Sequence, residues 1–202
     1  TSTATATITA VRPALEYKPV SLSLAQQKLV TLFRHRDGVL LRLRDGVGSW
    51  TLDCPSGQIP KFQFQVTAPW QDPADQPLPS PVLPDIVPPV FLDAQARLGG
   101  YTPHFTSLKL DLANKLAARR DANSTAGITQ YFISDRAPTG SLDPEADDLA
   151  TFNPYSLWRT STLSGLVARI GADAGNSIYV AVPKLRTTSV AERDRDGVGT
   201  YD

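Results

Sequence analysis

The chain has 202 residues, enough for one large or two small domains, and a hydrophobic fraction of 41% that is close to that of globular proteins. Twenty basic and twenty acidic side chains cancel, which disfavours a protein that holds nucleic acid by neutralising phosphates or that binds a membrane surface by charge. The single cysteine, Cys54, excludes an intrachain disulfide and a zinc site built from cysteines.

The sequence shows neither the pattern of a membrane span nor that of a leader at its start. No run approaches the roughly 20 apolar residues of a membrane span, and no basic segment followed by an apolar one opens the chain, so we expect no membrane anchor. The sequence contains no methionine, even at position 1, and we therefore expect both ends to be incomplete.

The first third of the chain is rich in strand patterns. The opening "TSTATATITA" alternates Thr with Ala and Ile, as in a strand with one face of small residues. "KLVTLFRH" and "VLLRLR" flank Arg36-Asp37-Gly38, which predicts a hairpin because Asp-Gly supplies the positive φ of a tight turn. A second Arg-Asp-Gly at residues 44–46 predicts another turn, followed by the strand "SWTLDC". "KFQFQVTA" then predicts an amphipathic strand with Phe62, Phe64 and Val66 on one face.

A proline-rich segment interrupts this pattern. Eight prolines lie between Pro69 and Pro89, which excludes a helix and a central strand and predicts an extended arm or linker. Its apolar side chains, among them Trp70, Leu83 and Ile86, either fold back over their own domain or lie along another subunit. A long irregular segment in a compact domain usually has a function.

The second half of the chain again favours strands. "FTSLKLDLANKL", "GITQYFISD", "NSIYVAVPK" and "LRTTSVAE" are predicted strands, and the last leads to a turn at Asp196-Gly197. "SLDPEADDLATF" predicts a short helix with Asp143 as the N-cap, Pro144 in the first helical position and Glu145 in the first turn. "TSTLSGLVARIG" is compatible with either a helix or a strand.

These elements together predict a mainly β protein. We expect one β-rich domain over residues 1–202, a β-sandwich or barrel with one or two short helices and a long proline-rich arm at 69–89.

The residues that carry catalysis elsewhere are sparse and scattered here. Nucleophilic catalysis usually needs a histidine beside the nucleophile, and the two histidines, His35 and His104, lie outside any such sequence frame. The acidic residues from Asp143 to Asp148 are explained by the start of a helix, and "GADAGNS" lacks the lysine and the following helix of a phosphate-binding loop. We therefore predict a protein that is not an enzyme and that has no cofactor.

The run "ERDRDG" from Glu192 to Gly197 has acidic residues at every second position, as a calcium-binding loop does at its start. Such a loop needs a bidentate acid at its twelfth position, beyond Asp202, and helices on both sides, whereas strands flank this run. We interpret Asp196-Gly197 as a hairpin turn and predict no metal site.

Two clusters of basic residues remain. One comprises the arginines from Arg34 to Arg44, and the other comprises Lys115, Arg119 and Arg120. A solvated strand face is the favoured interpretation, and docking onto acidic patches of a neighbouring subunit is the alternative.

The order of these pieces resembles a known family. "DGVLLRLRDGVGSWTLDCPSGQIPKFQFQVTAPW", the proline-rich segment running into "PPVFLDAQARLGGYTP", then "LKLDLANKLAARRDANSTAGITQYFISDRAPTGSLDPEA" and "GADAGNSIYVAVPKLRTTSVAERDRDGVGTYD" are similar to the tail tube proteins of long-tailed bacteriophages. The resemblance covers residues 15–202. The chain departs from the family pattern in ending at Asp202, where the last strand would be expected to continue.

The resemblance implies a structural role in the virion. Family members form rings, usually of six subunits, whose sheets join into one barrel, and the rings stack into a tube through which DNA is ejected. It therefore implies self-association, contacts with other tail proteins, passage of DNA without specific binding, and assembly in the host cytoplasm. No active-site residues are implied.

Two other classes of function stay open on sequence grounds. A baseplate hub, distal tail or tail terminator protein shares the fold, and a carbohydrate-binding β-sandwich would use aromatic residues as stacking platforms, with Trp50, Trp70, Trp158, Tyr131 and Tyr155 as candidates. For a tube subunit, the candidate subunit-interface residues are Arg36, Asp37, Trp70, Leu83, Ile86, Arg119, Arg120 and Asp196.

Overall fold

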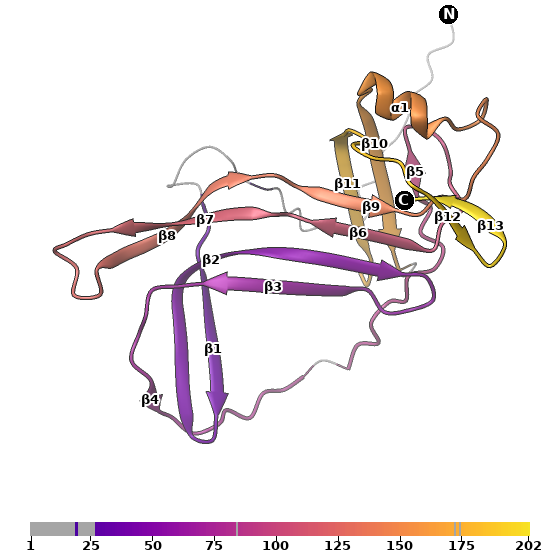
Figure 1. Cartoon of the computed structure of the whole chain (residues 1–202). Coiled ribbons are helices and arrows are strands. Elements are labelled where there is room, and N and C mark those ends of the chain that lie inside the picture. Colours follow the sequence, from indigo (N-terminus) through magenta and orange to yellow (C-terminus); the bar gives the residue numbers. More distant parts are fainter. Residues whose placement is uncertain (1–18, 20–26, 84, 172, 174) are drawn as a thin grey trace, which may run out of the picture.

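The computed structural model describes residues 19, 27–83, 85–171, 173 and 175–202, and the protein is mainly β (Figure 1). The strand expected over residues 1–10 lies outside the described residues. The described elements, in chain order, are β1 (Val30–Arg36), β2 (Val39–Pro55), β3 (Lys61–Thr67), β4 (Ala74–Asp75), β5 (Arg97–Leu98), β6 (Ser107–Asp111), β7 (Asn114–Arg120), β8 (Ile128–Arg136), β9 (Thr139–Leu142), α1 (Pro154–Thr160), β10 (Ser164–Ile170), β11 (Ile178–Leu185), β12 (Glu192–Arg195) and β13 (Val198–Tyr201).

The long strand β2 organises the largest sheet. Its first half pairs with β1 and β4, and its second half pairs with β3 on one side and β6 on the other, with β9 next to β6. Every one of these pairings is antiparallel. Beyond β6 and β9 the chain continues into the paired strands β7 and β8, so residues 107–142 form a long, interrupted hairpin.

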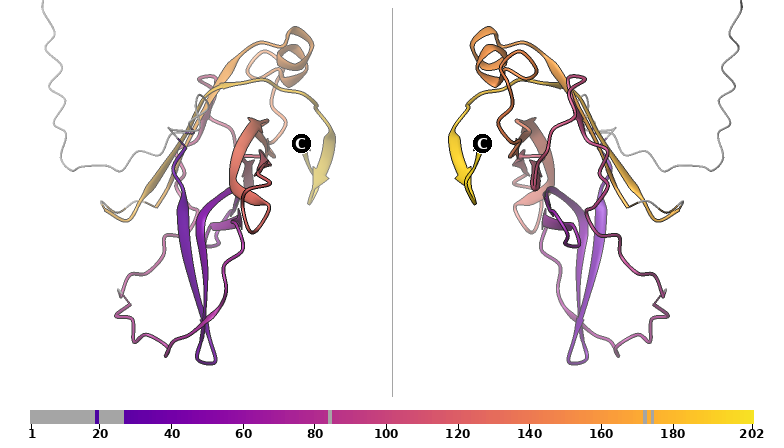
Figure 2. Two further views of the ribbon diagram at one scale, coloured as in Figure 1. Left: turned by 90° about the vertical axis from the view of Figure 1, so that its left-hand side faces the viewer. Right: turned by 90° about the vertical axis from the view of Figure 1, so that its right-hand side faces the viewer.

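A second sheet covers one end of the first. It consists of β11, β10 and the short β5, and Figures 1 and 2 show it crossing the end of the large sheet. The strand β10 alternates buried and half-buried residues, so most of the ambiguous stretch 160–171 is a strand, while Thr160 ends α1. The two sheets enclose the core, an arrangement consistent with a β-sandwich.

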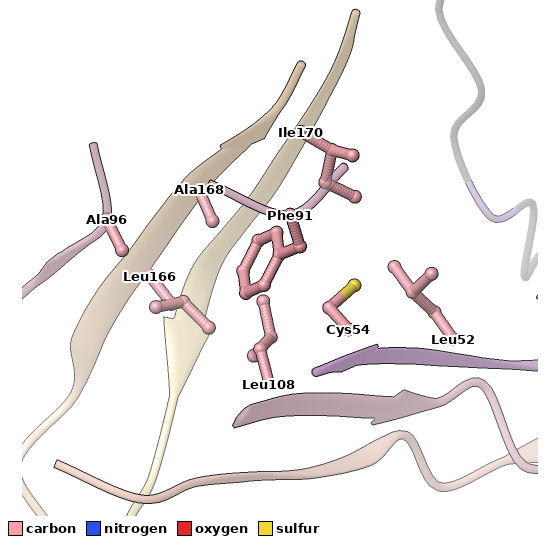
Figure 3. Packing of buried hydrophobic residues seen from close by; sticks show 8 residues of the cluster. All are labelled: Leu52, Cys54, Phe91, Ala96, Leu108, Leu166, Ala168 and Ile170. Carbon is pink, nitrogen blue, oxygen red and sulfur yellow. The ribbon is translucent and has the colours of Figure 1, made fainter. Parts of the chain in front are cut away.

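The core is small and lies between these two sheets (Figure 3). Leu52 and Cys54 of β2 and Leu108 of β6 face three residues of β10, Leu166, Ala168 and Ile170. Phe91 and Ala96 come from the connection that follows the proline-rich segment. Leu40 and Val47 of β2 are also buried, but they lie outside this cluster.

The two Asp-Gly hairpin turns are confirmed. Asp37 and Gly38 join β1 to β2, and Asp196 and Gly197 join β12 to β13; all four have positive φ. This is the backbone conformation for which Asp-Gly is selected. Strand predictions for residues 61–68, 127–135 and 176–184 are also confirmed, as β3, β8 and β11.

The turn predicted at residues 44–46 is wrong. The strand β2 runs through it, and the extra residue is absorbed in a β-bulge, because Val30 pairs with Gly46 while Leu32 pairs with Leu43. Asp45 takes the positive φ of 54° within the strand. A bulge bends a strand without ending it, and here it turns the β1–β2 hairpin away from the rest of the sheet (Figure 1).

The helix predicted at Asp143 is also wrong. Asp143 follows β9 directly, and the helix α1 begins ten residues later with Asn153 as N-cap, whose side chain accepts a hydrogen bond from the Ser156 amide at 2.8 Å. Both sites pair an N-cap residue with proline, but the Asp143 carboxylate is bound to another strand. Among the described residues α1 is the only helix, and no helix is long and apolar enough to span a membrane.

Two strand predictions need correction at their boundaries. Residues 105–116 form the two strands β6 and β7, because the chain bends at Ala113, which has a φ of +46°. Residues 185–192 are mostly irregular; β11 ends at Leu185 and β12 begins at Glu192.

The proline-rich residues 69–89 contain one short strand, β4, which pairs with the start of β2 near the tip of the β1–β2 hairpin. The described residues from 76 to 89 lie outside strands and helices and lead back to the core. In Figures 1 and 2 this stretch passes beside the hairpin as a separate trace.

Candidate assembly surfaces

The four strands β3, β2, β6 and β9 present one face that carries only polar side chains at its centre. Thr51 of β2 lies opposite Gln63 and Asp111, and Asp53 lies opposite Lys61 and Lys109. Thr139 and Ser141 of β9 extend the row beside Asp111 and Lys109. Directly opposite residues share a face of the sheet, so acidic and basic side chains alternate here with hydroxyl and amide groups.

The other face of the same strands is apolar but only partly covered. Beyond the buried Leu52, the ring of Trp50 packs edge to face on Phe62 with centroids 5.5 Å apart, and Phe62 stacks on Phe64 at 5.9 Å. Phe64 is nevertheless 70% exposed. The amphipathic pattern of β3 is therefore confirmed as a strand, but its apolar side is left open within the described chain.

Both sides of this sheet end in strands with no further partner among the described residues. The strand β3 pairs with β2 alone, and β9 pairs with β6 alone. The strand β8, which continues into β9, pairs with β7 alone. Unpaired edges of this length are a site of strand addition in many proteins.

The structure places the predicted interface residues on separate projections. Arg36 and Asp37 form the tip of the β1–β2 hairpin, where their side chains are exposed and form an ion pair at 3.4 Å. Arg119 and Arg120 are exposed at the end of β7, and Asp196 is exposed in the β12–β13 turn. The structure brings none of these three groups to another, and their contact with a neighbour stays a prediction.

The interface candidates of the proline-rich segment are among the most exposed apolar residues. Trp70 is 69% exposed, and its indole donates a hydrogen bond to Asp72 at 3.2 Å. Leu83 and Ile86 are 79% and 63% exposed. Of the two sequence alternatives, these side chains do not fold back over their own domain.

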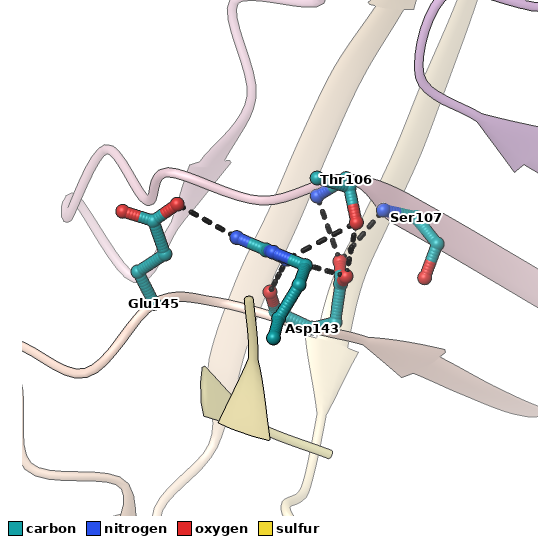
Figure 4. Close-up of polar contacts among 5 residues, drawn as sticks. Thr106, Ser107, Asp143 and Glu145 are labelled. Atoms are coloured by element: carbon teal, nitrogen blue, oxygen red, sulfur yellow. Dashed lines mark hydrogen bonds and ion pairs between the residues drawn. The ribbon is translucent and has the colours of Figure 1, made fainter. Parts of the chain in front are cut away.

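A polar cluster that the sequence did not predict holds the C-terminal hairpin (Figure 4). The Asp143 carboxylate accepts hydrogen bonds from the backbone amides of Thr106 at 2.9 Å and Ser107 at 2.6 Å. Arg195 of β12 reaches the same carboxylate at 2.8 Å and Glu145 at 2.7 Å. Burial by itself would raise the pKa of Asp143, but a hydrogen bond from the Thr106 hydroxyl, the two amide hydrogen bonds and the Arg195 charge lower it below its ordinary value.

Backbone contacts complete this attachment. The Ala146 amide donates to the Gly199 carbonyl at 2.8 Å, and the Tyr201 amide donates to the Pro144 carbonyl at 2.9 Å. Residues 144–146 thus meet β13 at an isolated antiparallel bridge between Glu145 and Thr200. Arg195, which precedes the predicted Asp196-Gly197 turn, links this hairpin to Asp143 and Glu145 by ion pairs.

The second attachment of this hairpin is aromatic. Tyr155 of α1 packs edge to face on Tyr201 with centroids 5.7 Å apart, and its hydroxyl donates a hydrogen bond to Glu192. That hydrogen bond to a carboxylate raises the pKa of Tyr155 to about 12. Among the suggested stacking residues, Trp158 lies on α1, Trp70 lies in the proline-rich segment and Trp50 packs on Phe62, so these three indoles belong to different elements.

The chemically reactive side chains are placed as follows. Cys54 is buried in the core, and this burial, with the nearby Asp53 charge, raises the pKa of its thiol to about 11. His35 lies in β1 and His104 in the loop before β6. Within the described ranges no group of three or more His, Cys, Asp or Glu side chains is arranged to hold a metal ion.

Comparison with known proteins identifies the family of this chain. A search of curated proteins finds no match. A family model described as phage tail tube protein matches residues 1–199. Because this match spans nearly the whole sequence, the chain belongs to the phage tail tube protein family and is a structural component of the bacteriophage virion.

Proposed function

We propose that this protein is the ring-forming subunit of a phage tail tube. In this proposal six copies close into a ring, the rings stack, and DNA passes through the central channel during ejection. The subunit acts by assembly and not by catalysis, it joins other tail proteins at the ends of the tube, and assembly takes place in the host cytoplasm.

The two unpaired edges of the large sheet are the observation that carries this proposal. The strands β3, β2, β6 and β9 alternate in direction, so β3 and β9 run antiparallel to each other. Rotation about an axis near the strand direction keeps every direction unchanged. The β9 edge of one copy therefore meets the β3 edge of the next as an antiparallel pair, and repetition closes a ring without any free edge.

The polar face of the same sheet supports a channel. When the sheets of the subunits join into a ring, one face of each sheet lines the channel. The opposite face of the sheet packs against β10 through the core. The face with Thr51, Asp53, Lys109 and Asp111 is then the inner wall. Its charges are balanced by neighbours of opposite sign, which favours passage of DNA because tight binding would require an excess of Lys or Arg.

The exposed apolar residues outside the sheet support contacts between rings. Leu78, Val82, Leu83 and Val87 of the proline-rich segment are each at least 72% exposed. Apolar surface gathered in this way marks interaction sites. A segment stiffened by proline also loses little conformational entropy when it is ordered against a neighbour.

Negative-stain microscopy combined with size-exclusion chromatography tests the assembly. We expect rings and long tubes, with a monomer peak only at low concentration. A stable monomer at all concentrations would contradict the proposal, and a monomer that binds glycan arrays would indicate the carbohydrate-binding alternative. Single rings that do not stack would indicate a terminator or baseplate protein.

Cysteine labelling tests the channel wall. In assembled tubes we expect Thr51→Cys and Thr139→Cys to react with a small maleimide but not with a maleimide attached to a large polymer, which cannot enter the channel. Val82→Cys, on the exposed proline-rich segment, is the control that reacts with both. Labelling of Thr51→Cys by the large reagent in intact tubes would place this face outside.

A further inference from the structure

A side-chain amide occupies the outer edge of β8. Gln27 Nε2 donates to the Ile133 carbonyl at 2.9 Å, and the Ile133 amide donates to Gln27 Oε1 at 2.9 Å. These residues are 106 positions apart in the sequence. Because β8 pairs with β7 on its other side, the two bonds fill the edge that faces away from the described sheet.

This pair of bonds has the pattern of a strand pairing. In an antiparallel ladder, one residue exchanges both of its backbone hydrogen bonds with the residue opposite. A primary amide carries a donor and an acceptor in the same plane as a peptide group. Gln27 therefore takes the position of a residue on an added strand, at one point of the edge.

We propose that the β8 edge at Ile133 is an acceptor for the β3 strand of a second copy of this chain, and that Gln27 holds this edge in the unassembled subunit. The inference rests on the ring closure proposed above, in which the β9 edge meets β3, and it extends that contact along the chain to β8. It adds that Gln27 occupies the Ile133 position of this edge before assembly and must leave it when the second copy binds.

The choice of β3 follows from the free edges of the sheet. The strand β3 lies on the opposite side of the sheet from β9 and pairs with β2 alone within the described chain. Its direction is antiparallel to that of β9, which the chain reaches directly from β8. Its seven residues also carry the exposed Phe64 that an isolated subunit leaves in water.

Replacement of Gln27 by an incoming strand leaves the number of hydrogen bonds at Ile133 unchanged and adds hydrogen bonds at other positions of the edge. An incoming strand replaces the two Gln27 hydrogen bonds with two backbone bonds. It also pairs with further positions, since the two-residue period of the ladder makes the Tyr131 backbone face the same edge. Gln27 thus raises the concentration at which assembly begins without blocking it, which protects an exposed edge from unregulated pairing.

Substitution of Gln27 tests the inference through three readouts. In the unassembled chain, Gln27→Ala should increase the hydrogen exchange rate of the Ile133 amide at least 10-fold. The same variant should lower the threshold concentration for tube formation about 3-fold to 10-fold. Gln76→Ala, at an exposed glutamine near β4, is the matched control and should change neither value.

A synthetic peptide with the β3 sequence, residues 61–67, provides a readout that does not need tubes. It should bind the Gln27→Ala monomer several-fold more tightly than the unsubstituted monomer and should protect the Ile133 amide. Equal affinity for both proteins would overturn the inference. A Gln27→Ala variant that folds but needs a higher concentration to assemble would also overturn it, because Gln27 would then support the assembled state.

The failure of this inference is distinct from the failure of the proposed function. If the unsubstituted protein forms no rings, the ring proposal fails, while exchange at Ile133 and peptide binding still report whether β8 accepts a strand. If tubes form and Gln27→Ala leaves their threshold unchanged, only the role of Gln27 is wrong.

Discussion

At the scale of single residues, two sites show how context decides what a side chain does. Asp143 lies in a half-buried position where two backbone amides and Arg195 converge on its carboxylate. The tripeptide Arg-Asp-Gly occurs three times, yet Gly46 alone among its glycines does not have positive φ. At Gly46 a glycine is needed because the Val66 side chain packs closely against it, and a Cβ atom would lie 2.7 Å from Val66 Cγ1.

The Asp143 cluster predicts a specific loss of stability in acid. Because the folded state lowers the pKa of Asp143, its contribution is present above the ordinary pKa of 3.8 and is lost as the pH falls through the folded value. We expect Asp143→Asn to lower the free energy of unfolding at pH 7 by about 1 to 2 kcal/mol, at the modest end because water reaches the site.

Urea titrations from pH 7 to pH 2 measure this effect in the monomer. The stability of the variant should fall less steeply with acid than that of the unsubstituted protein. Asp85→Asn, at an exposed carboxylate, is the control and should keep the original slope. Parallel curves for the Asp143→Asn and unsubstituted proteins would show that Asp143 does not contribute to the acid response.

The two glycines of equivalent tripeptides should respond differently to alanine. Gly38→Ala meets no atom within 4 Å and should cost about 1 kcal/mol through its positive φ alone. Gly46→Ala should cost about 1 to 3 kcal/mol because it overpacks against Val66. In a double-mutant cycle, Val66→Ala should recover part of the loss for Gly46→Ala and none for Gly38→Ala. Equal coupling in both cycles would contradict this explanation.

At the scale of elements, two hairpins and the proline-rich segment extend away from a small core. The β1–β2 hairpin turns away at the Asp45 bulge, the β7–β8 hairpin continues beyond the four-stranded part of the sheet, and the proline-rich segment connects the hairpin tip to the core (Figures 1 and 2). The β1–β2 hairpin and the proline-rich segment contain many of the exposed apolar residues, among them Phe33, Val82 and Leu83. Their exposed side chains leave apolar surface that is available for contact with other subunits.

The proline-rich segment should matter for assembly and not for folding. Because Leu83 and Ile86 are exposed, the Leu83→Asp, Ile86→Asp double variant should change the free energy of unfolding of the monomer by less than about 0.5 kcal/mol. It should raise the threshold concentration for tubes at least 10-fold, measured by light scattering. Leu52→Ala, in the core, is the contrasting variant and should lower stability by about 2 to 5 kcal/mol. Normal tubes from the double variant would exclude this segment from the ring contacts.

At the scale of the whole molecule, charge and apolar surface favour different modes of association. The chain has no net charge, and its basic clusters are few and exposed. Exposed large apolar side chains occur from Leu29 to Val198 and lie on many elements. Association through apolar contacts and strand edges is therefore favoured over association through opposite charges.

This difference predicts how assembly depends on salt. The threshold concentration should stay constant or fall when sodium chloride is raised from about 0.05 to 0.5 M, because only interactions between charges are screened. Ammonium sulfate should lower it further, since it strengthens apolar burial. A threshold that rises steeply with sodium chloride would instead favour charged docking through Arg36, Arg119 and Arg120.

Short stretches of sequence account for the turns and several of the strands of this protein. Asp-Gly fixed the turns at Asp37 and Asp196 because few other pairs accept two consecutive positive φ values. Alternation of apolar and polar residues fixed the strand at Lys61–Thr67, and proline density excluded regular structure from most of residues 69–89. The mainly β fold and the family resemblance follow from these local signals and their order.

Contacts between distant segments determine which of these local preferences appear in the folded chain. The Arg-Asp-Gly at residues 44–46 became a bulge because β1 continues to pair on both sides of it, and Asp143 did not start a helix because the amides of Thr106 and Ser107 occupy its carboxylate. Likewise, no local pattern could show that Gln27 meets Ile133 or that Phe64 stays exposed. These outcomes depend on contacts between residues far apart in the chain, whose free energies exceed the small preferences that any short stretch carries.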